Sequence, residues 1–331
     1  MRMKKFINQP ENLVRELLEG LALSHPNQVR LVGSNLVVRA KAKDGGKVGI
    51  VTLGGSGHEP GLSGFVGEGM LDVSVAGEIF AAPGAPRCLE AIKLADRGAG
   101  VLLVVLNHAG DILSSNLTME MAKREGLNVR RVITHEDIAG GPNPDDRRGL
   151  VGFLPVYKVA GAAAEQGCSL DQCAVIAERM ERNMRTLAVA VTTATHPATG
   201  HPIFELGDDE MEIGMGQHGE AGTGRMKLRT ADETAELMLD MLLNDLKVTA
   251  GEELLVIVNG AGATTLMELF LVFRRVHALL LGKNIKLARG KVGEFITTQE
   301  QGGFQLLIAR MDPELLRLWD APSDAPYFVA K

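Results

Sequence analysis

The sequence lacks several features that mark broad classes of protein. It has only three cysteines, Cys88, Cys168 and Cys173. Their spacing fits neither a disulfide framework nor a common zinc pattern, so a reducing compartment is expected. Basic residues are not in excess, because 35 Lys and Arg stand against 41 Asp and Glu and leave a net charge of −6. This balance argues against a nucleic-acid surface and favours a small ligand.

No hydrophobic run is long enough to span a membrane. The longest, residues 101–106, suits a buried strand, and the N-terminal segment turns polar too early for a secretory signal. The sequence therefore predicts a cytoplasmic protein with no membrane segment. It contains neither a Walker A motif nor an HExxH metal motif, although a metal site of another kind stays open.

The chain is long and rich in glycine. Its 331 residues are too many for one ordinary domain core and enough for two. The 39 glycines indicate many turns or close backbone approaches. Apolar residues make up 45% and charged residues 23%, which is ordinary for a globular protein.

Hydrophobic periodicity alternates between helix and strand along the chain. Helices are expected over 11–23, 87–97, 113–125, 155–166, 169–184, 230–243 and 265–281. Strands are expected over 36–40, 47–53, 100–106, 129–134, 186–193, 212–217, 254–259, 285–289 and 304–310. This order predicts an α/β protein with two domains, residues 1–185 and 186–331, each a mixed or mostly parallel sheet flanked by helices.

The segment GGSGHEP, residues 54–60, follows an expected strand. A helix is expected after it, and backbone N–H groups at a helix start can hold an anion or a polar ligand oxygen. The glycines match neither nucleotide pattern, since no Gly-Lys-Ser/Thr follows and the third glycine of the dinucleotide fingerprint is missing at position 60. A purely structural turn is the alternative, and His58 and Glu59 favour a site.

The turn NHAGD, residues 107–111, follows the strand expected at 100–106. Ligands of open α/β sheets bind beyond the carboxyl ends of the strands, which makes Asp111 a candidate for proton transfer. The alternative is that Asp111 caps a helix that starts near Ile112, and the two roles are compatible. His108 is more typical of a loop histidine than of a catalyst.

In a third segment, GMGQHGE at residues 214–220, glycines surround His218. Neutral imidazole is a nucleophile and a base near pH 7, and its glycine neighbours shield it little. An ordinary loop histidine is the alternative. The other histidines with similar or weaker cases are His25, His135, His196, His201 and His277.

Six segments in one order carry a resemblance to a known family. They are GGSGHEP, VAGEIFAAP (75–83), NHAGD, KVAGAAAEQG (158–167), FELGDDEMEIGMGQHGE (204–220) and VNGAGATTLMEL (258–269). Together they resemble the dihydroxyacetone-binding K subunit of dihydroxyacetone kinase, over nearly the whole chain.

The resemblance implies a covalent mode of ketose binding. The K subunit holds dihydroxyacetone as a hemiaminal on a histidine that corresponds to His218. The family's two proton-transfer residues correspond to His58 and Asp111. A reversible bond of this kind adds affinity for a substrate of few atoms and selects ketoses over glycerol. The family's backbone contacts with the substrate correspond to Gly55, Ser56 and Gly57.

The resemblance also implies partners. Phosphoryl transfer is mostly positioning and charge stabilisation, and in this family ADP or ATP and magnesium are held by an L subunit, whereas the K subunit binds no cofactor. ATP-dependent relatives carry the L part as a fused domain, so a free-standing K subunit with a separate L partner is expected here. In the sugar-phosphotransferase version an M subunit re-phosphorylates the ADP. The K subunit of the family is a homodimer.

The sequence departs from the family pattern around the expected pocket. Leu106 stands where the family has a substrate-contacting lysine, and His108 stands where it has tyrosine. Residues 114–115 are Ser-Ser instead of Asn-Phe, and residues 219–222 are Gly-Glu-Ala-Gly instead of Gly-Glu-Pro-Gly. We therefore hypothesise an altered substrate preference, for a four-carbon ketose such as erythrulose.

A second class of function stays open. Some K-like relatives bind the ketose without supporting phosphorylation and act as ligand sensors for a transcription regulator. His218 does not discriminate, because both classes keep the covalent histidine. The loss of lysine at position 106 favours a divergent role, whereas the retained His58 and Asp111 favour the enzyme, since a sensor needs no activated hydroxyl.

Overall fold

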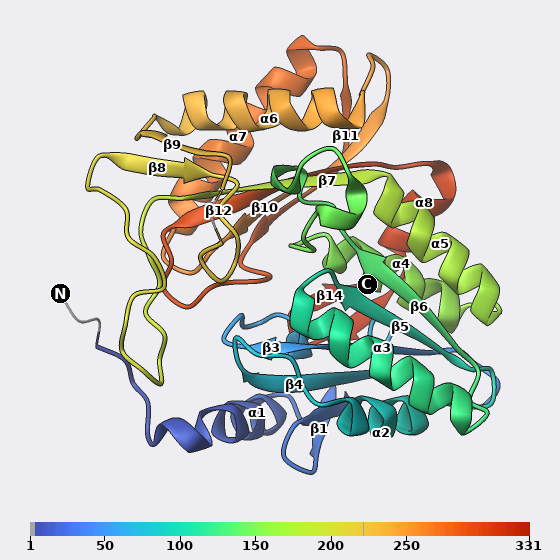
Figure 1. The fold of residues 1–331 in the computed structure, drawn as a ribbon. Coiled ribbons are helices and arrows are strands. Elements are labelled where there is room, and N and C mark those ends of the chain that lie inside the picture. Colours follow the sequence, from blue (N-terminus) through green and yellow to red (C-terminus); the bar gives the residue numbers. More distant parts are fainter. Residues whose placement is uncertain (1–3, 221) are drawn as a thin grey trace. The chain divides into compact units, whose positions relative to one another are not determined.

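In the computed structural model, which describes residues 4–220 and 222–331, contacts divide the chain into two compact units. The N-terminal unit comprises residues 4–134, 153–179 and 317–331, and the C-terminal unit comprises residues 135–152 and 180–316. The longest segment of the C-terminal unit begins at Met180, close to the boundary expected at residue 185. Segments 135–152 and 317–331 each group with the unit on the other side of that boundary. Each unit contains its own six-stranded sheet (Figure 1).

The sheet of the N-terminal unit has the strand order β1-β2-β4-β3-β5-β6. The β4–β3, β3–β5 and β5–β6 pairs are parallel, whereas β1–β2 and β2–β4 are antiparallel. Because the carboxyl ends of parallel strands meet at one edge of a sheet, the residues that follow β3, β4 and β5 come together there. The strands are β1 (Val29–Val32), β2 (Leu36–Arg39), β3 (Gly49–Ser56), β4 (Val73–Ile79), β5 (Val101–Leu106) and β6 (Val129–Thr134).

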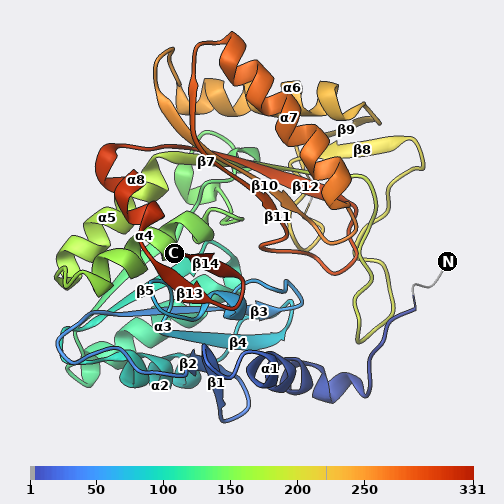
Figure 2. The ribbon, with the colours of Figure 1, turned by 180° about the vertical axis from the view of Figure 1, so that it is seen from behind.

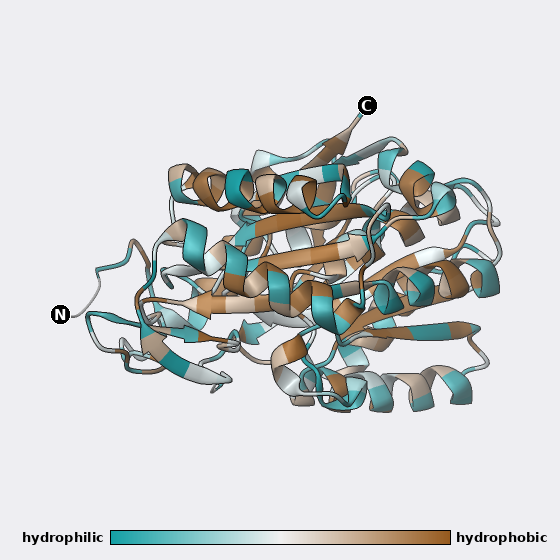
Figure 3. Cartoon of the chain, turned by 90° about the horizontal axis from the view of Figure 1, so that it is seen from above, coloured by the Kyte–Doolittle hydropathy of each residue, from teal (hydrophilic) through white to brown (hydrophobic). Residues whose placement is uncertain are grey.

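Helices cover both faces of this sheet. α2 (Ala85–Ala95) and α3 (Ala109–Arg124) pack together on one face, and α4 (Phe153–Glu165) contacts β3 and β5 on the other. Every residue of β5 is therefore buried, and its sequence is apolar without alternation. In the chain as a whole, most strands are largely hydrophobic, whereas the helices alternate between hydrophobic and polar residues (Figure 3). α1 (Leu13–Ser24) packs against β1 and β4, and α5 (Leu170–Arg182) follows α4.

The sheet of the C-terminal unit has the strand order β11-β10-β12-β7-β8-β9. Only its β10–β11 pair is parallel. Helices α6 (Ala231–Leu246) and α7 (Leu266–Gly282) lie together on this sheet (Figure 2), and each begins with a capping box that satisfies its first N–H groups. The strands are β7 (Met184–Ala190), β8 (Glu210–Ile213), β9 (Gly224–Lys227), β10 (Glu253–Gly260), β11 (Lys286–Gly293) and β12 (Gly303–Arg310).

The predicted α/β class, with a sheet and flanking helices in each of two units, is confirmed. The prediction of a helix after residues 54–60 is wrong, because only a 3-10 turn, Ser63–Phe65, follows β3. α3 begins at Ala109, four residues before the expected start at 113. β8 ends at Ile213 and not at 217, since Gly214 turns the chain with a φ of +78°.

Several short elements were not expected from the sequence. They are β1, β9, α8 (Pro313–Asp320) and the hairpin of β13 (Ser323–Ala325) and β14 (Phe328–Ala330). Within residues 4–220 and 222–331, none of the helices has the length and apolar character needed to cross a bilayer.

Candidate functional site

In the N-terminal unit, β3 runs through Gly54 and Gly55 and ends at Ser56. The Ser56 hydroxyl donates to the carbonyl oxygen of Gly77 at 2.8 Å, and the backbone N–H of Phe80 donates to the carbonyl oxygen of Ser56 at 2.8 Å. These bonds fix the end of β3 against β4 and the residue that follows it. Since only a 3-10 turn follows β3, the predicted helix start is wrong, whereas the binding of a ligand oxygen by the backbone N–H groups of this loop stays a prediction.

The glycines of this loop are needed for close packing. A Cβ atom on Gly55 would lie 2.8 Å from the backbone nitrogen of Ala81. Gly57 has a φ of +99°, and a Cβ atom there would lie 2.7 Å from Cε1 of Phe80. Larger residues would therefore push the loop away from residues 80–81.

His58 is buried between this loop and the segment after β4. The residue is only 5% exposed, and its imidazole lies against the ring of Phe80 with the ring centroids 5.0 Å apart. The neighbouring Glu59 accepts a hydrogen bond from the backbone N–H of Gly57 at 2.9 Å, and burial raises the pKa of its carboxyl. The imidazole of His58 is thus held in a fixed, largely dry position.

Asp111 lies in the first turn of α3 and is 8% exposed. The expectation that Asp111 caps a helix starting near Ile112 is wrong, because the helix begins at Ala109 and its N-cap residue is His108. A carboxylate in a first turn is favoured by the helix dipole. Burial raises the pKa of the nearby Cys88 to about 11, and the charge of Asp111 adds to this rise.

Residues 80–83 connect the two predicted sites of this unit. They contact the loop at Gly55 and Gly57. At their other end, the Ser114 hydroxyl of α3 donates to the carbonyl oxygen of Pro83 at 2.6 Å. The loop with His58 and the first turn with Asp111 therefore lie around one segment, at the carboxyl edge of the parallel strands.

Two of the positions that depart from the family pattern, Leu106 and His108, lie at the same edge, and a third, Ser115, lies in α3. Leu106 is the last residue of β5 and is only 3% exposed. His108 is partly exposed and starts α3 without a side-chain capping bond. Ser115 is buried and accepts a hydrogen bond from Arg131 at 2.9 Å.

In the C-terminal unit, His218 lies on a turn that follows β8. The turn begins at Gly214 and contains Gly219, both with positive φ, +78° and +85°. The guanidinium of Arg148 donates to the carbonyl oxygen of Gly214 at 2.7 Å and forms an ion pair with Asp137, also at 2.7 Å. This anchored turn leaves the side chain of His218 30% exposed.

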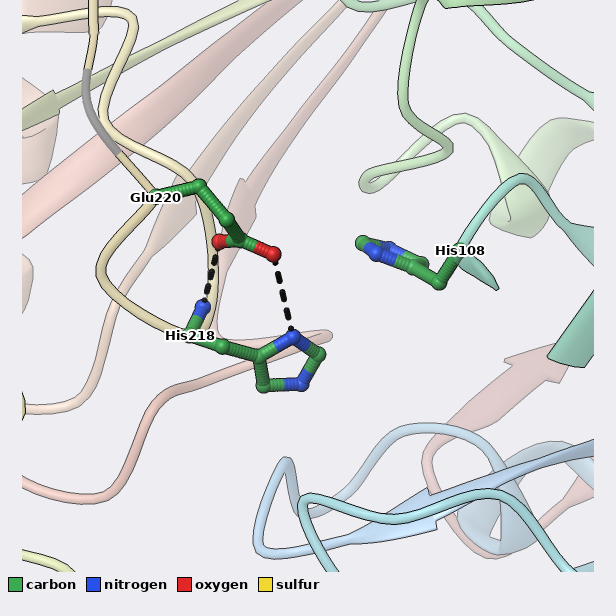
Figure 4. Close-up of side chains that lie close together, drawn as sticks. All are labelled: His108, His218 and Glu220. Atoms are coloured by element: carbon green, nitrogen blue, oxygen red, sulfur yellow. Dashed lines mark hydrogen bonds and ion pairs between the residues drawn. The ribbon is translucent and has the colours of Figure 1, made fainter. Parts of the chain in front are cut away.

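Glu220 binds His218 twice (Figure 4). Its Oε2 accepts the backbone N–H of His218 at 2.9 Å, and its Oε1 lies 3.3 Å from the ring nitrogen Nδ1. Partial burial opposes ionisation of Glu220, but these bonds and the attraction of the imidazole outweigh it and hold the pKa of its carboxyl well below the usual value.

Sequence reasoning assigned no role to Glu220. The signal was a carboxylate two residues after a histidine, across a glycine that takes a left-handed conformation. Ala221, part of the departure at 219–222, lies outside the described residues.

Of the other histidines, His135 pairs with Glu181 at 2.8 Å, and this hydrogen bond raises the pKa of His135.

Comparisons with known proteins cover nearly the whole chain. The Dak1 domain family model matches residues 19–327. The chain is 39% identical over 314 residues to the PTS-dependent dihydroxyacetone kinase 1, dihydroxyacetone-binding subunit DhaK, of Listeria innocua, covering 94% of this chain and 95% of that one.

Two further relatives differ in what their names state. The L-erythrulose kinase of Pectobacterium atrosepticum is 37% identical over 332 residues, which are 98% of this chain and 56% of that protein. The solved structure of the dihydroxyacetone kinase operon co-activator Dha-DhaQ matches with a TM-score of 0.91 and 30% identity, over 96% of this chain and 98% of that one. The fold, the order of the motifs and these matches agree, and the chain belongs to the Dak1 domain family, with the DhaK subunits among its relatives.

Proposed function

We propose that this protein is the ketose-binding subunit of a dihydroxyacetone-type kinase and that His218 holds the ketose covalently. The observation that carries the proposal is similarity over nearly the full length to a relative named as a dihydroxyacetone-binding subunit. The turn around His218 supports it, since it presents a partly exposed imidazole whose Nδ1 faces a carboxylate.

The proposed covalent step is a reversible addition. The lone pair of Nε2 of His218 forms a bond to the carbonyl carbon, and the π electrons of the C=O bond move onto oxygen. That oxygen takes up one proton, and the ring can give up the proton on Nδ1 in return. The product is a neutral hemiaminal, and reversal restores histidine and ketone.

We assign the proton transfers to the N-terminal unit. His58 would donate to the carbinol oxygen, and Asp111 would accept the proton of the terminal hydroxyl that receives the phosphoryl group. Their burial supports these roles, because a dry, fixed acid or base keeps its geometry. Gly55, Ser56 and Gly57 would contact the substrate through the backbone.

The phosphoryl donor would be held by another chain. We propose that a separate L subunit carries ADP or ATP with magnesium and that an M subunit completes a phosphotransferase relay in the cytoplasm. The absence of a Walker A motif from the sequence supports a chain without its own nucleotide, and the Listeria innocua relative is named PTS-dependent.

The deciding experiment combines an adduct with turnover. Wild-type protein and His218→Ala are incubated with dihydroxyacetone or erythrulose and examined by intact-mass spectrometry, then supplied with the cognate L subunit, nucleotide and magnesium. We expect an adduct mass and phosphorylation for the wild type and neither for His218→Ala. Phosphorylation by His218→Ala at the wild-type rate would exclude the covalent role.

The same assay tests substrate preference. Leu106 and His108 stand where the family pattern has lysine and tyrosine, and these differences support a preference for a four-carbon ketose. The relative named L-erythrulose kinase supports it as well. We expect a higher kcat/KM with erythrulose. Faster turnover of dihydroxyacetone than of either erythrulose enantiomer would refute this preference.

A ligand-sensing coactivator is the second candidate, and the match to the co-activator Dha-DhaQ favours it. Such a protein would form the adduct on His218 and would not support turnover. An adduct without phosphorylation in the presence of an active cognate L subunit would select the coactivator.

We also propose that the protein is a homodimer formed through the C-terminal unit. The outer face of α7 exposes Leu266, Met267, Phe270 and Leu271, each at least 45% exposed, next to the edge strand β11. Burying such a face against a second copy removes apolar surface from water. Phe270→Glu should give a monomer by sedimentation, whereas Leu113→Glu, at an exposed leucine of α3, should stay dimeric.

A further inference from the structure

We infer that Glu220 is the positioning residue that selects the reactive form of His218. The inference rests on the proposed covalent role of His218 and concerns which ring nitrogen carries the proton. In a neutral imidazole one nitrogen bears hydrogen and the other bears the lone pair. Only the nitrogen with the lone pair can add to a carbonyl carbon.

The two contacts of Glu220 decide between the nitrogens. An ionised carboxylate only accepts hydrogen bonds, so Nδ1, 3.3 Å from Oε1, carries the hydrogen. The lone pair is then on Nε2, on the far side of the ring. Oε2 at the same time accepts the backbone N–H of His218 at 2.9 Å, which fixes the carboxylate to the turn (Figure 4).

The turn is built to leave room for this carboxylate. A Cβ atom on Gly216 would lie 2.1 Å from Oε2 of Glu220 and 2.3 Å from Nη1 of Arg148. The carboxylate and the guanidinium thus both lie close to Gly216, where the turn has no side chain. Arg148 is itself held by Asp137 and by the carbonyl oxygen of Gly214, so the guanidinium on this side of the turn is fixed in place.

Glu220 also serves the charged stage of the addition. When Nε2 bonds to the carbonyl carbon, the ring becomes an imidazolium and the ketone oxygen becomes an alkoxide. The carboxylate opposes the positive charge through Nδ1–H until the oxygen gains its proton and the ring loses one. Glu220 therefore stabilises the charged intermediate of the addition as well as the reactive tautomer.

Glu220→Gln is a sharp test, because it removes one of two acceptors without shortening the side chain. The single amide oxygen accepts the hydrogen bond from the backbone N–H of His218, so the NH₂ group faces Nδ1 as a donor. Nδ1 must then supply the lone pair, and the hydrogen moves to Nε2. We expect the tautomer to reverse and the affinity for ketose to fall by roughly 10- to 100-fold, with the fold unchanged.

Two measurements separate this inference from the proposed function. The tautomer is determined by ¹⁵N NMR of histidine-labelled protein without ketose, and the adduct is titrated by intact mass. Glu220→Asp, which keeps two oxygens, should retain the Nδ1–H tautomer and partly restore binding. The matched control is Glu212→Gln, since Glu212 accepts from the backbone N–H of Gly222 and from Arg225 in the same region and does not touch the ring.

Each outcome has one meaning. Reversal in Glu220→Gln alone, with weaker adduct formation, supports the inference. An unchanged tautomer in Glu220→Gln overturns it, whatever the ketose does. Absence of an adduct in the wild type overturns the proposed function, while the ligand-free NMR comparison still decides whether Glu220 selects the tautomer.

Discussion

At the scale of single residues, Gly57 controls the contact between Phe80 and His58. Its φ is +99°, and a Cβ atom would lie 2.7 Å from Cε1 of the Phe80 ring. We expect Gly57→Ala to displace this ring, to reduce ketose binding about tenfold or more and to destabilise the protein by about 1–3 kcal/mol. Thermal unfolding and adduct titration measure the two effects.

Gly98 provides the matched control for this substitution. Its φ is +94°, yet no atom lies within 4 Å of its Cβ position. Gly98→Ala therefore introduces similar backbone strain without crowding, and it should lower stability while leaving ketose binding unchanged. Equal losses of binding in the two variants would show that backbone strain, and not the contact with Phe80, is responsible.

Glu136 should make stability depend on pH. It is fully buried, its Oε1 accepts the backbone N–H groups of Leu150 and Gly152 at 2.7 and 2.8 Å, and burial, with a smaller effect from the charge of Glu181, raises its pKa to about 7. The folded protein thus holds this proton more tightly than the unfolded chain does. The free energy of unfolding should fall as pH rises from about 4.5 to about 7, by roughly 2–3 kcal/mol.

Glu136→Gln tests this dependence, because the amide keeps the accepting oxygen and does not titrate. Urea unfolding at about pH 5 and about pH 8 should show a smaller loss of stability in the variant than in the wild type. Glu120→Gln changes an exposed carboxyl and should leave the loss as it is. If Glu136→Gln loses as much stability between these two pH values as the wild type does, groups other than Glu136 cause the pH dependence.

At the scale of elements, long periodic segments were predictable and local turns were not. β5 was expected within one residue, because its six apolar residues, buried on both faces, leave no competing pattern. The start of α3 was missed because Ala109 and Gly110 lack a capping signal, and the helix begins after a residue whose side chain makes no capping bond.

The site followed the same rule. The loops that carry His58, Asp111 and His218 could be identified from motif order, and the structure brings the first two together around residues 80–83. The contact of Glu220 with the imidazole could not be derived, because it depends on the left-handed conformation of Gly219. Long-range packing of Phe80 against His58 has no signature in either local sequence.

Asp72 joins several elements of the N-terminal unit through buried charges. Its carboxylate contacts Arg39 of β2 at 3.0 Å and Lys43 at 2.7 Å, and it accepts the backbone N–H of Ile50 of β3 at 2.8 Å. Asp72→Ala would leave two buried cations without this partner and should cost about 3–5 kcal/mol in urea unfolding. Glu19→Ala breaks an exposed pair with Arg15 and should cost no more than about 0.5 kcal/mol. Similar costs for both variants would contradict a special role of burial.

At the scale of the whole molecule, neither unit is a continuous stretch of chain. The path passes between the units after residues 134, 152, 179 and 316. If the C-terminal unit unfolded alone, the N-terminal unit would have to close a loop on the order of 140 residues between its segments, at an entropic cost of about 4 kcal/mol. This connectivity predicts that the two units unfold together although each has a separate hydrophobic core.

The single tryptophan makes this coupling measurable. Trp319 is 7% exposed, belongs to the N-terminal unit and packs edge-on against Phe328 of the same unit with the ring centroids 5.4 Å apart, so its fluorescence reports on packing within that unit. Leu242→Ala removes a fully buried side chain from the core of the C-terminal unit and should cost about 2–5 kcal/mol. We expect the fluorescence midpoint in urea to shift as far as the circular dichroism midpoint, whereas Leu228→Ala, at an exposed leucine of the same unit, should shift neither. A fluorescence midpoint that stays at the wild-type value while circular dichroism shows an earlier transition would mean that the units unfold independently, and that the loop-closure cost is met by contacts within the N-terminal unit.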